Sequence, residues 1–170
     1  SMLAHACDPD MALSNFVDIV NAMQSSRRDL DRVIPDAGAL RRLITVLGAS
    51  DAMGKFMRFR PELVEAASVG SADSHLFNRA QRRARLLMEV GADPDDQAMP
   101  VASKDLAEAA TALRAGYRRQ LAAIIAQDVM AEDPIRIQPT ISSELSDLAD
   151  AALEGALAIA RHETEGSEHV

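Results

Sequence analysis

Aromatic side chains are almost absent from this chain of 170 residues. It contains one tyrosine, four phenylalanines and no tryptophan, although 48% of its residues are hydrophobic. Alanine, leucine, isoleucine, valine and methionine must therefore fill the interior. Such side chains suit helices that pack closely on small residues, whereas a sheet favours β-branched and aromatic ones. The composition predicts an all-α fold around a single hydrophobic core.

Capping residues mark where the first helices begin. Asp8 before Pro9 is typical of an N-cap followed by proline in the first turn, and apolar residues follow at helical spacing as far as Met23. Asp36 and Ser50 are expected to cap the next two helices. Gly48 is expected to end the helix between them in the left-handed conformation. Pro61 predicts the start of a fourth helix.

The second half of the chain predicts longer helices. One is expected from Leu76 to Val90, ended by Gly91, and the segment from Ala92 to Val101 is loop-like. The longest helix is expected from Ser103 to about Ala131. Prolines at 134 and 139 predict an extended connector between them. A final helix from about Ile141 to His162 is expected to bury six residues, namely Leu145, Leu148, Ala152, Leu153, Ala156 and Ile159.

The fold class that follows is an irregular all-α bundle of about six or seven helices with two long C-terminal helices. Residues 8–162 are expected to form one helical domain. Residues 1–7 are expected to be loose, with Ser1-Met2 resembling the remnant of a cleaved expression tag, and residues 163–170 to be a disordered tail. One cysteine excludes an internal disulfide, and no apolar run is long enough to span a bilayer, so a cytoplasmic location is expected.

The net charge of -8 is unevenly distributed. Residues 41–90 carry nine basic and five acidic residues, whereas the rest of the chain carries nine against twenty-one. Sixteen of the 18 basic residues are arginine, and no aromatic residues alternate with them to stack on bases. Nucleic-acid binding is therefore not expected, and solvent-exposed charge is the simpler interpretation.

The sequence lacks the motifs of a self-contained enzyme. A nucleotidyltransferase core needs a strand, a Gly-Gly or Gly-Ser turn for phosphates, and an Asp-x-Asp about a dozen residues later to bind two metal ions. Gly70-Ser71 could form a turn of that kind, but glutamine and arginines follow it at that distance. His5 with Cys7 is too small a set for zinc. Catalytic, cofactor-binding and metal-binding residues are therefore not expected in this chain.

Asp128 is a candidate for a structural polar network. It lies one turn after Ile124, along the apolar stripe of the longest expected helix. If it is buried, it requires cations or donors, because an unpaired buried charge costs several kcal/mol, roughly. The candidate partners are Arg114, Arg118 and Arg119, or Arg41 or Arg42 from a neighbouring helix. The alternative is that Asp128 lies at the edge of the stripe in water.

Four blocks of this sequence, in order, resemble a known family. They are Asp8-Pro9-Asp10 with Ala12-Leu13, the stretch from Leu40 to Glu65 with its Gly48-Ala49-Ser50 junction, the helix from Leu113 to Val129, and the segment from Leu145 to Arg161. Together they are similar to the helical region before the first catalytic core of glutamine synthetase adenylyltransferases. Gln120, Gln127 and Val129 depart from that pattern, which weakens a polar network with the core.

The resemblance implies a parent enzyme with two nucleotidyltransferase cores, one removing AMP from glutamine synthetase and the other adding it from ATP. Magnesium and ATP are implied for that parent and not for this chain. The implied partners are the downstream core of the same polypeptide, glutamine synthetase and a PII-type regulator. The expected protein-contact face is the arginine-rich outer side of one helix, formed by Arg79, Arg82, Arg83 and Arg85. The competing hypothesis is a stand-alone helical adaptor or the ligand-binding domain of a regulator.

Overall fold

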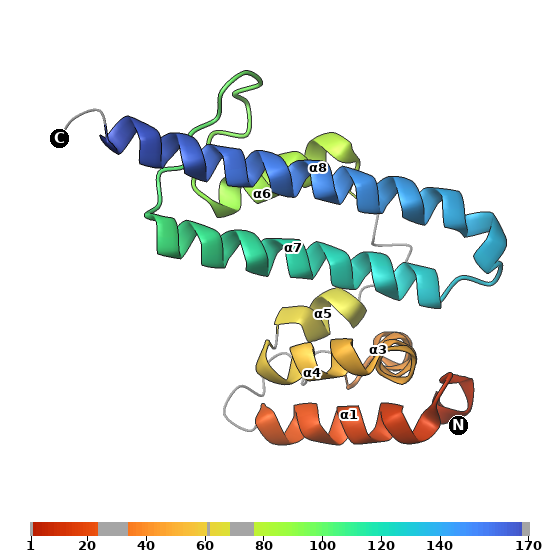
Figure 1. The fold of residues 1–170 in the computed structure, drawn as a ribbon. Coiled ribbons are helices and arrows are strands. Elements are labelled where there is room, and N and C mark those ends of the chain that lie inside the picture. The colour runs from red at the N-terminus through yellow and green to blue at the C-terminus, as the bar shows by residue number, and fades with distance from the viewer. Residues whose placement is uncertain (1, 24–33, 61, 69–76, 168–170) are drawn as a thin grey trace. The chain divides into compact units, whose positions relative to one another are not determined.

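The computed structural model describes residues 2–23, 34–60, 62–68 and 77–167. All regular structure in these ranges is helical, as the composition predicted, and it ends in two long helices (Figure 1). The contacts divide the chain into two compact units. The first unit combines Ser1–Leu76 with Ala122–Gln138, and the second combines Phe77–Leu121 with Pro139–Val170. The single-domain organisation of residues 8–162 stays a prediction.

Among its described residues, the first unit contains a short 3-10 helix, Met2–His5, and four α-helices. These are α1 (Pro9–Ala22), α3 (Ala37–Ala49), α4 (Asp51–Phe59) and α5 (Glu62–Ser68). The end of α7 (Leu106–Val129) also belongs to it. Its core is aliphatic and methionine-rich, and the largest fully buried members include Ile19, Met23, Leu43, Leu47, Met57 and Leu63.

Three predicted N-caps are confirmed in this unit. The carboxylate of Asp8 accepts a hydrogen bond from the amide of Met11 at 2.9 Å. Asp36 accepts from the amides of Gly38 and Ala39, which lowers the pKa of its carboxyl group. Ser50 accepts from the amide of Met53 at 3.3 Å. Each cap satisfies an amide that has no partner within its own helix.

The prediction for Gly48 is wrong. Helix α3 continues through it to Ala49, and Gly48 does not have a positive φ. A side chain at Gly48 would approach the Cβ of Ala6 at 2.8 Å. The glycine therefore permits the N-terminal segment to lie against α3, and Ser50 ends that helix instead.

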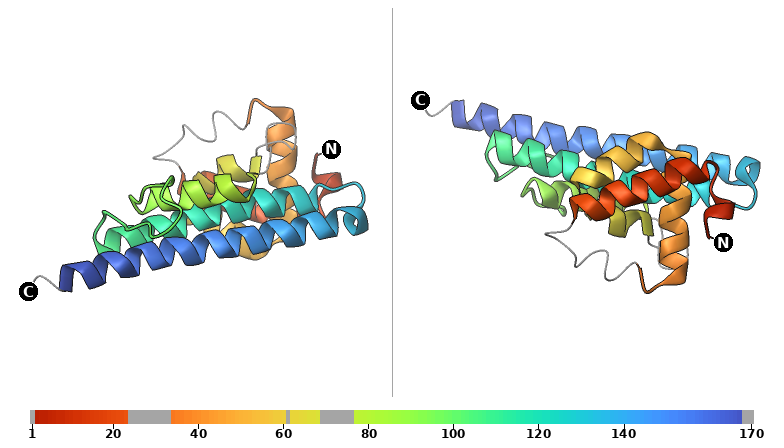
Figure 2. Two further views of the ribbon diagram at one scale, coloured as in Figure 1. Left: turned by 90° about the horizontal axis from the view of Figure 1, so that it is seen from above. Right: turned by 90° about the horizontal axis from the view of Figure 1, so that it is seen from below.

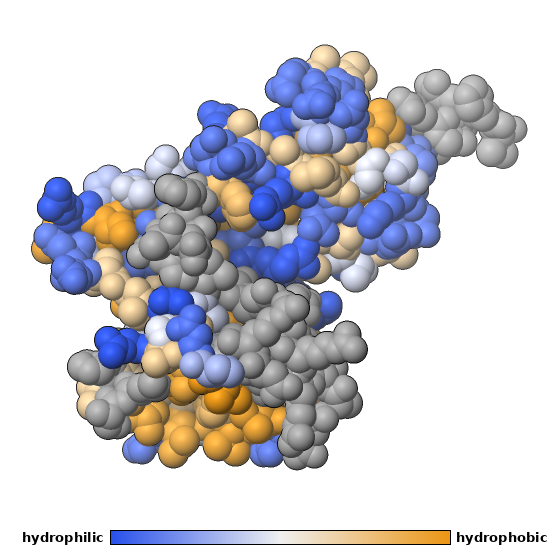
Figure 3. All heavy atoms as spheres, turned by 180° about the vertical axis from the view of Figure 1, so that it is seen from behind, coloured by the Kyte–Doolittle hydropathy of each residue, from blue (hydrophilic) through white to orange (hydrophobic). Residues whose placement is uncertain are grey.

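Several large apolar side chains of the first unit remain exposed. Leu13 is 48% exposed, Val17 is 45% exposed and Phe59 is 69% exposed. Hydrophobic surface is visible on this unit in the lower part of Figure 3. The predicted helix start at Pro61 and the predicted phosphate turn at Gly70-Ser71 lie outside the described residues.

The second unit consists of α6 (Arg79–Glu89), most of α7 and most of α8 (Pro134–Ser167). The α7 and α8 segments of this unit run side by side in both views of Figure 2. Gly91 ends the α6 region with a φ of 76°, as predicted. Buried alanines and aliphatic residues form its core, with Leu87, Val90, Ala109, Ala158 and Ile159 among them.

Helix α8 differs from the prediction in its ends and in its buried face. The segment between Pro134 and Pro139, which was expected to be an extended connector, is helical. Asp133 accepts a hydrogen bond from the amide of Arg136 at 3.0 Å, and Pro134 takes the first helical position. The helix extends to Ser167 and contains Pro139. Leu148 and Ile159 are buried as expected, but Leu145, Leu153 and Ala156 are exposed. Ala151 and Ala158 occupy the buried face in their place.

Candidate functional site

The four predicted contact arginines lie on α6, whose start is fixed by a capping box. Asn78 accepts a hydrogen bond from the amide of Gln81, and the Gln81 side chain accepts one from the amide of Asn78. This reciprocal pair satisfies two amide groups at the helix terminus. The helix begins at Arg79, three residues later than predicted, and presents its arginines in different directions.

Arg82 is buried, with 1% of its surface exposed, so the expectation that it lies on an outer face is wrong. Its Nη1 donates to the side-chain oxygen of Gln120 at 3.3 Å, and its Nη2 donates to Glu144 at 3.1 Å. Its buried Nε has no hydrogen-bond partner among the described residues. Burial lowers the pKa of Arg82, and the carboxylates of Glu144 and Asp147 oppose that shift.

Glu144, the partner of Arg82, is also largely buried. Burial raises the pKa of Glu144, the charge of Arg82 lowers it, and the charge of Asp147 raises it. Only 12% of the Glu144 side chain is exposed. A buried ion pair gains its stability by satisfying each partner, so loss of either partner leaves an uncompensated charge.

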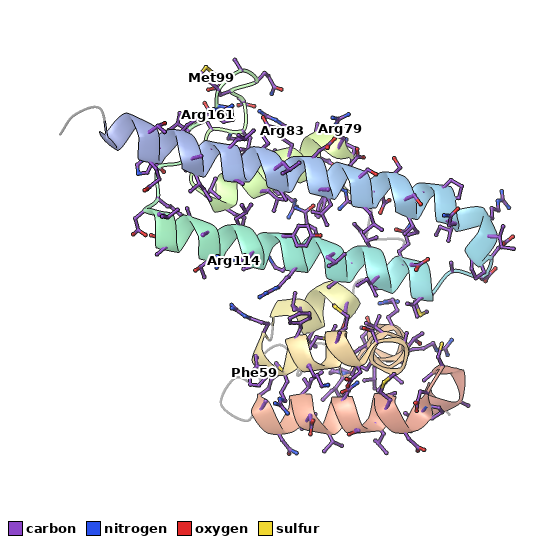
Figure 4. The ribbon with its side chains drawn as sticks, viewed as in Figure 1. Phe59, Arg79, Arg83, Met99, Arg114 and Arg161 are labelled. Atoms are coloured by element: carbon purple, nitrogen blue, oxygen red, sulfur yellow. The ribbon has the colours of Figure 1, made fainter. Side chains whose placement is uncertain are left out.

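Arg83 joins α6, α8 and the loop from Ala92 to Ser103. Its Nε and Nη2 bind the two carboxylate oxygens of Glu154 at 2.7 and 2.6 Å. Its Nη1 and Nη2 also donate to the carbonyls of Pro94 and Asp96 at 2.8 and 2.6 Å. Arg161 donates to the carbonyl of Pro100 at 3.0 Å. Figure 4 shows Arg83 and Arg161 close to the loop that carries Met99.

The other two arginines of α6 are accessible. The Arg79 side chain is 72% exposed, and its Nη2 lies 3.0 Å from Asp150. Arg85 is exposed, and its guanidinium carbon lies 3.8 Å from the centre of the Phe77 ring. A cation over an aromatic face is attracted by the ring's quadrupole, whose face is electrostatically negative. The contact role predicted for the four arginines stays a prediction, and Arg79 and Arg85 are the two members that a partner could reach.

The second predicted group, on α7, does not converge on Asp128. Asp128 and Arg114 are both exposed, and Arg118 is half-buried. Arg119 binds Glu89 of α6. The placement of Asp128 agrees with the alternative in which it lies at the edge of the apolar stripe.

Two aspartates in the loop after α6 accept hydrogen bonds that stabilise turns. Asp93 accepts from the amide of Asp95 at 2.9 Å. Asp96 accepts from the amides of Ala98 and Met99, which lowers the pKa of its carboxyl group. Within the described ranges, no three histidine, cysteine or acidic side chains are grouped so that they could hold a metal ion. No described helix is long and apolar enough to cross a membrane.

The acidic partners of these arginines were not predicted from the sequence. Glu144, Asp147, Asp150 and Glu154 recur at three- and four-residue intervals along α8, a spacing that places them on one side of a helix. Arg79, Arg82 and Arg83 have the corresponding spacing on α6. These complementary charge patterns indicate that the two helices pair. The second unit is therefore a helical assembly in which arginines bind carboxylates of the same chain.

Known proteins match this chain over nearly its whole length. A bifunctional glutamine synthetase adenylyltransferase/adenylyl-removing enzyme from Bifidobacterium longum subsp. infantis is 97% identical over 99% of the chain and 16% of the relative. The enzyme of the same name from Leifsonia xyli is 36% identical over 97% of the chain and 15% of the relative. That from Cutibacterium acnes is 33% identical over 94% of the chain and 16% of the relative. No family model and no solved structure matches the chain.

These matches confirm the resemblance drawn from the sequence. The chain belongs to the family of bifunctional glutamine synthetase adenylyltransferase/adenylyl-removing enzymes, and it corresponds to the N-terminal portion of relatives found mainly in actinobacteria. It spans 16% of the length of the first three of these relatives. In them, this region is part of a larger polypeptide.

Proposed function

We propose that this chain is a non-catalytic helical segment that precedes the deadenylylating nucleotidyltransferase core of a glutamine synthetase adenylyltransferase. The parent enzyme would regulate nitrogen assimilation by adding AMP to glutamine synthetase and removing it. The observation that carries this proposal is the 97% identity to an enzyme of that name over 99% of the chain.

The chemistry of the described side chains supports a structural role. Arg82, Arg83 and Arg119 all bind carboxylates within the same unit, so these charges are used internally. A phosphoryl-transfer site instead needs carboxylates free to hold metal ions. We therefore assign magnesium and ATP to the parent's cores and not to this segment.

The segment would act by supporting or docking other parts of the parent and its partners. The proposed partners are the core of the same polypeptide, glutamine synthetase and a PII-type regulator. Arg79 and Arg85 are the basic residues proposed to contribute to protein contacts, because both are exposed. An acidic surface on a partner would attract them at long range.

The reading frame of the gene that encodes this chain tests the proposal against a stand-alone adaptor. We expect coding sequence beyond Val170 that predicts a strand, a Gly-Gly or Gly-Ser turn and an Asp-x-Asp about a dozen residues later. A natural stop codon directly after Val170, in a gene that yields a stable protein of this length, would contradict it.

A further inference from the structure

An uncharged strip runs along the outer side of α8 in the second unit. It consists of Leu145, Ala149, Leu153, Ala156, Leu157 and Ala160, and is called the α8 outer face here. The three leucines are 41%, 66% and 53% exposed, and the three alanines are exposed as well. At 1.5 Å per residue, the face is about 24 Å long.

The residues of this face are arranged as a helix-packing surface. Leu145, Ala149, Leu153 and Leu157 follow one another at four-residue intervals, so they form one ridge along the helix. Ala156 and Ala160 lie in the neighbouring row, where small side chains allow a second helix to approach closely. Ridges of this kind pack into the grooves of a second helix.

No described helix of the second unit covers this face. α8 contacts the rest of that unit through buried Leu148, Ala151, Ala158 and Ile159. The acidic side of α8, which pairs with α6, occupies a further part of its circumference. In both views of Figure 2, the α7 segment of this unit runs along one side of α8.

The size of the face argues against a second copy of the chain as its occupant. Each partner in a stable complex typically contributes roughly 800 Å². Three half-exposed leucines and three alanines supply much less area than that. Such a face suffices for a segment of the same polypeptide, because covalent attachment makes its binding intramolecular and raises its effective concentration. The chain spans only 16% of its relatives, so much of a parent polypeptide is available.

We infer that the α8 outer face binds an amphipathic helix from the remaining part of the parent polypeptide, as an intramolecular docking surface. This inference rests on the proposed function, because it requires that the chain be part of a longer enzyme. The partner helix would present apolar residues without charge, because an unpaired charge placed against this face would lose its hydration.

Thiol labelling tests the inference by comparing the isolated chain with the full-length Bifidobacterium longum subsp. infantis relative, using the numbering of this chain. Cys7 is exposed, so it is first replaced by serine. The reporter is Leu153→Cys, at the centre of the face. The matched control is Ser143→Cys, an exposed position one turn before Asp147 on the charged side of the same helix. The rate of reaction with a maleimide is measured for each variant in both proteins.

We expect the thiol at position 153 to react at least about tenfold more slowly in the full-length enzyme than in the isolated chain, because a covered thiol reacts only when the contact opens. The thiol at position 143 should react equally fast in both. Equal rates at position 153 in the two proteins would overturn the inference. Equal protection of positions 153 and 143 in the full-length enzyme would also overturn the inference. Slow labelling of position 153 in an isolated chain that light scattering shows to be dimeric would overturn it as well.

This result is separate from the test of the proposed function. A reading frame that ends at Val170 would remove the longer parent on which both depend. A frame that continues, combined with an unprotected thiol at position 153, would leave the proposed function intact and remove only the docking surface.

Discussion

Arg79 and Arg82 lie one turn apart on α6 and yet occupy opposite environments. The Arg79 side chain is 72% exposed and binds carboxylates in water, whereas that of Arg82 is 1% exposed. The exposed pair is screened by solvent, so it contributes little to stability. The buried pair holds two charges that have lost their hydration and depend on each other.

Alanine substitutions at these two positions should therefore differ strongly. Arg82→Ala leaves Glu144 without its partner and should lower the free energy of unfolding by about 3 kcal/mol. Arg79→Ala should lower it by less than about 1 kcal/mol. Urea denaturation followed by circular dichroism measures both values. Similar losses for the two variants would show that Arg82 is not held in a buried ion pair.

The raised pKa of Glu144 gives the stability of the protein a specific pH dependence. Its pKa is raised above the ordinary value of 4.5 by burial, while Arg82 lowers it and Asp147 raises it. A carboxyl group whose pKa is higher in the folded state stabilises the fold most below its unfolded pKa. That contribution is lost as pH rises through the folded pKa.

Replacing Glu144 with glutamine should remove this dependence. As pH rises above 4.5, the free energy of unfolding of the wild-type protein should fall relative to that of Glu144→Gln. Urea denaturation of both proteins at a series of pH values from about 4 to 8 measures the difference. Two curves that stay parallel across this range would contradict the assigned direction of the shift.

At the scale of the helices, the sequence predicted what local interactions decide. The caps at Asp8, Asp36 and Ser50 were predicted because each acts on amides within three residues of itself. The buried face of α8 was not predicted. Its hydrophobic spacing favoured Leu145 and Leu153, but pairing of its carboxylates with α6 turns those leucines outward.

Pro139 lies inside α8 and should weaken it. A proline there cannot donate a hydrogen bond to the carbonyl of Ile135. Pro139→Ala should therefore raise the free energy of unfolding by about 1–2 kcal/mol. Pro134→Ala is the matched control and should have little effect, because the first helical position needs no amide donor. The melting temperature of each variant measures the effect, and a decrease for Pro139→Ala would contradict it.

Gly91 should tolerate no side chain. Its φ is 76°, and a Cβ there would approach the Oγ of Ser103 at 2.3 Å. Gly91→Ala should lower the free energy of unfolding by about 1–3 kcal/mol. Gly38→Ala is a suitable comparison, because its φ is not positive and the nearest atoms to a Cβ there belong to side chains at 3.2 and 3.3 Å. Equal melting temperatures for the two variants would contradict the strain assigned to Gly91.

At the scale of the whole molecule, composition and motif order predicted the fold class and the family. The scarcity of aromatic residues favoured helices, and the order of four helical blocks indicated the enzyme family that the relatives confirm. The partners of the α6 arginines could not be assigned from either helix alone, because only the charge patterns of α6 and α8 taken together indicate that these helices pair. The division into two units depends on contacts between segments that are distant in sequence.

The central claim is that these helices support chemistry performed elsewhere in the parent enzyme. Its most direct test is to incubate the purified chain with adenylylated glutamine synthetase, magnesium and inorganic phosphate, and to measure the nucleotide released. The full-length Bifidobacterium longum subsp. infantis relative, assayed at the same concentration, is the positive control. We predict release by the full-length enzyme and none above background by the isolated chain. Nucleotide release by the isolated chain in proportion to its concentration would contradict the claim.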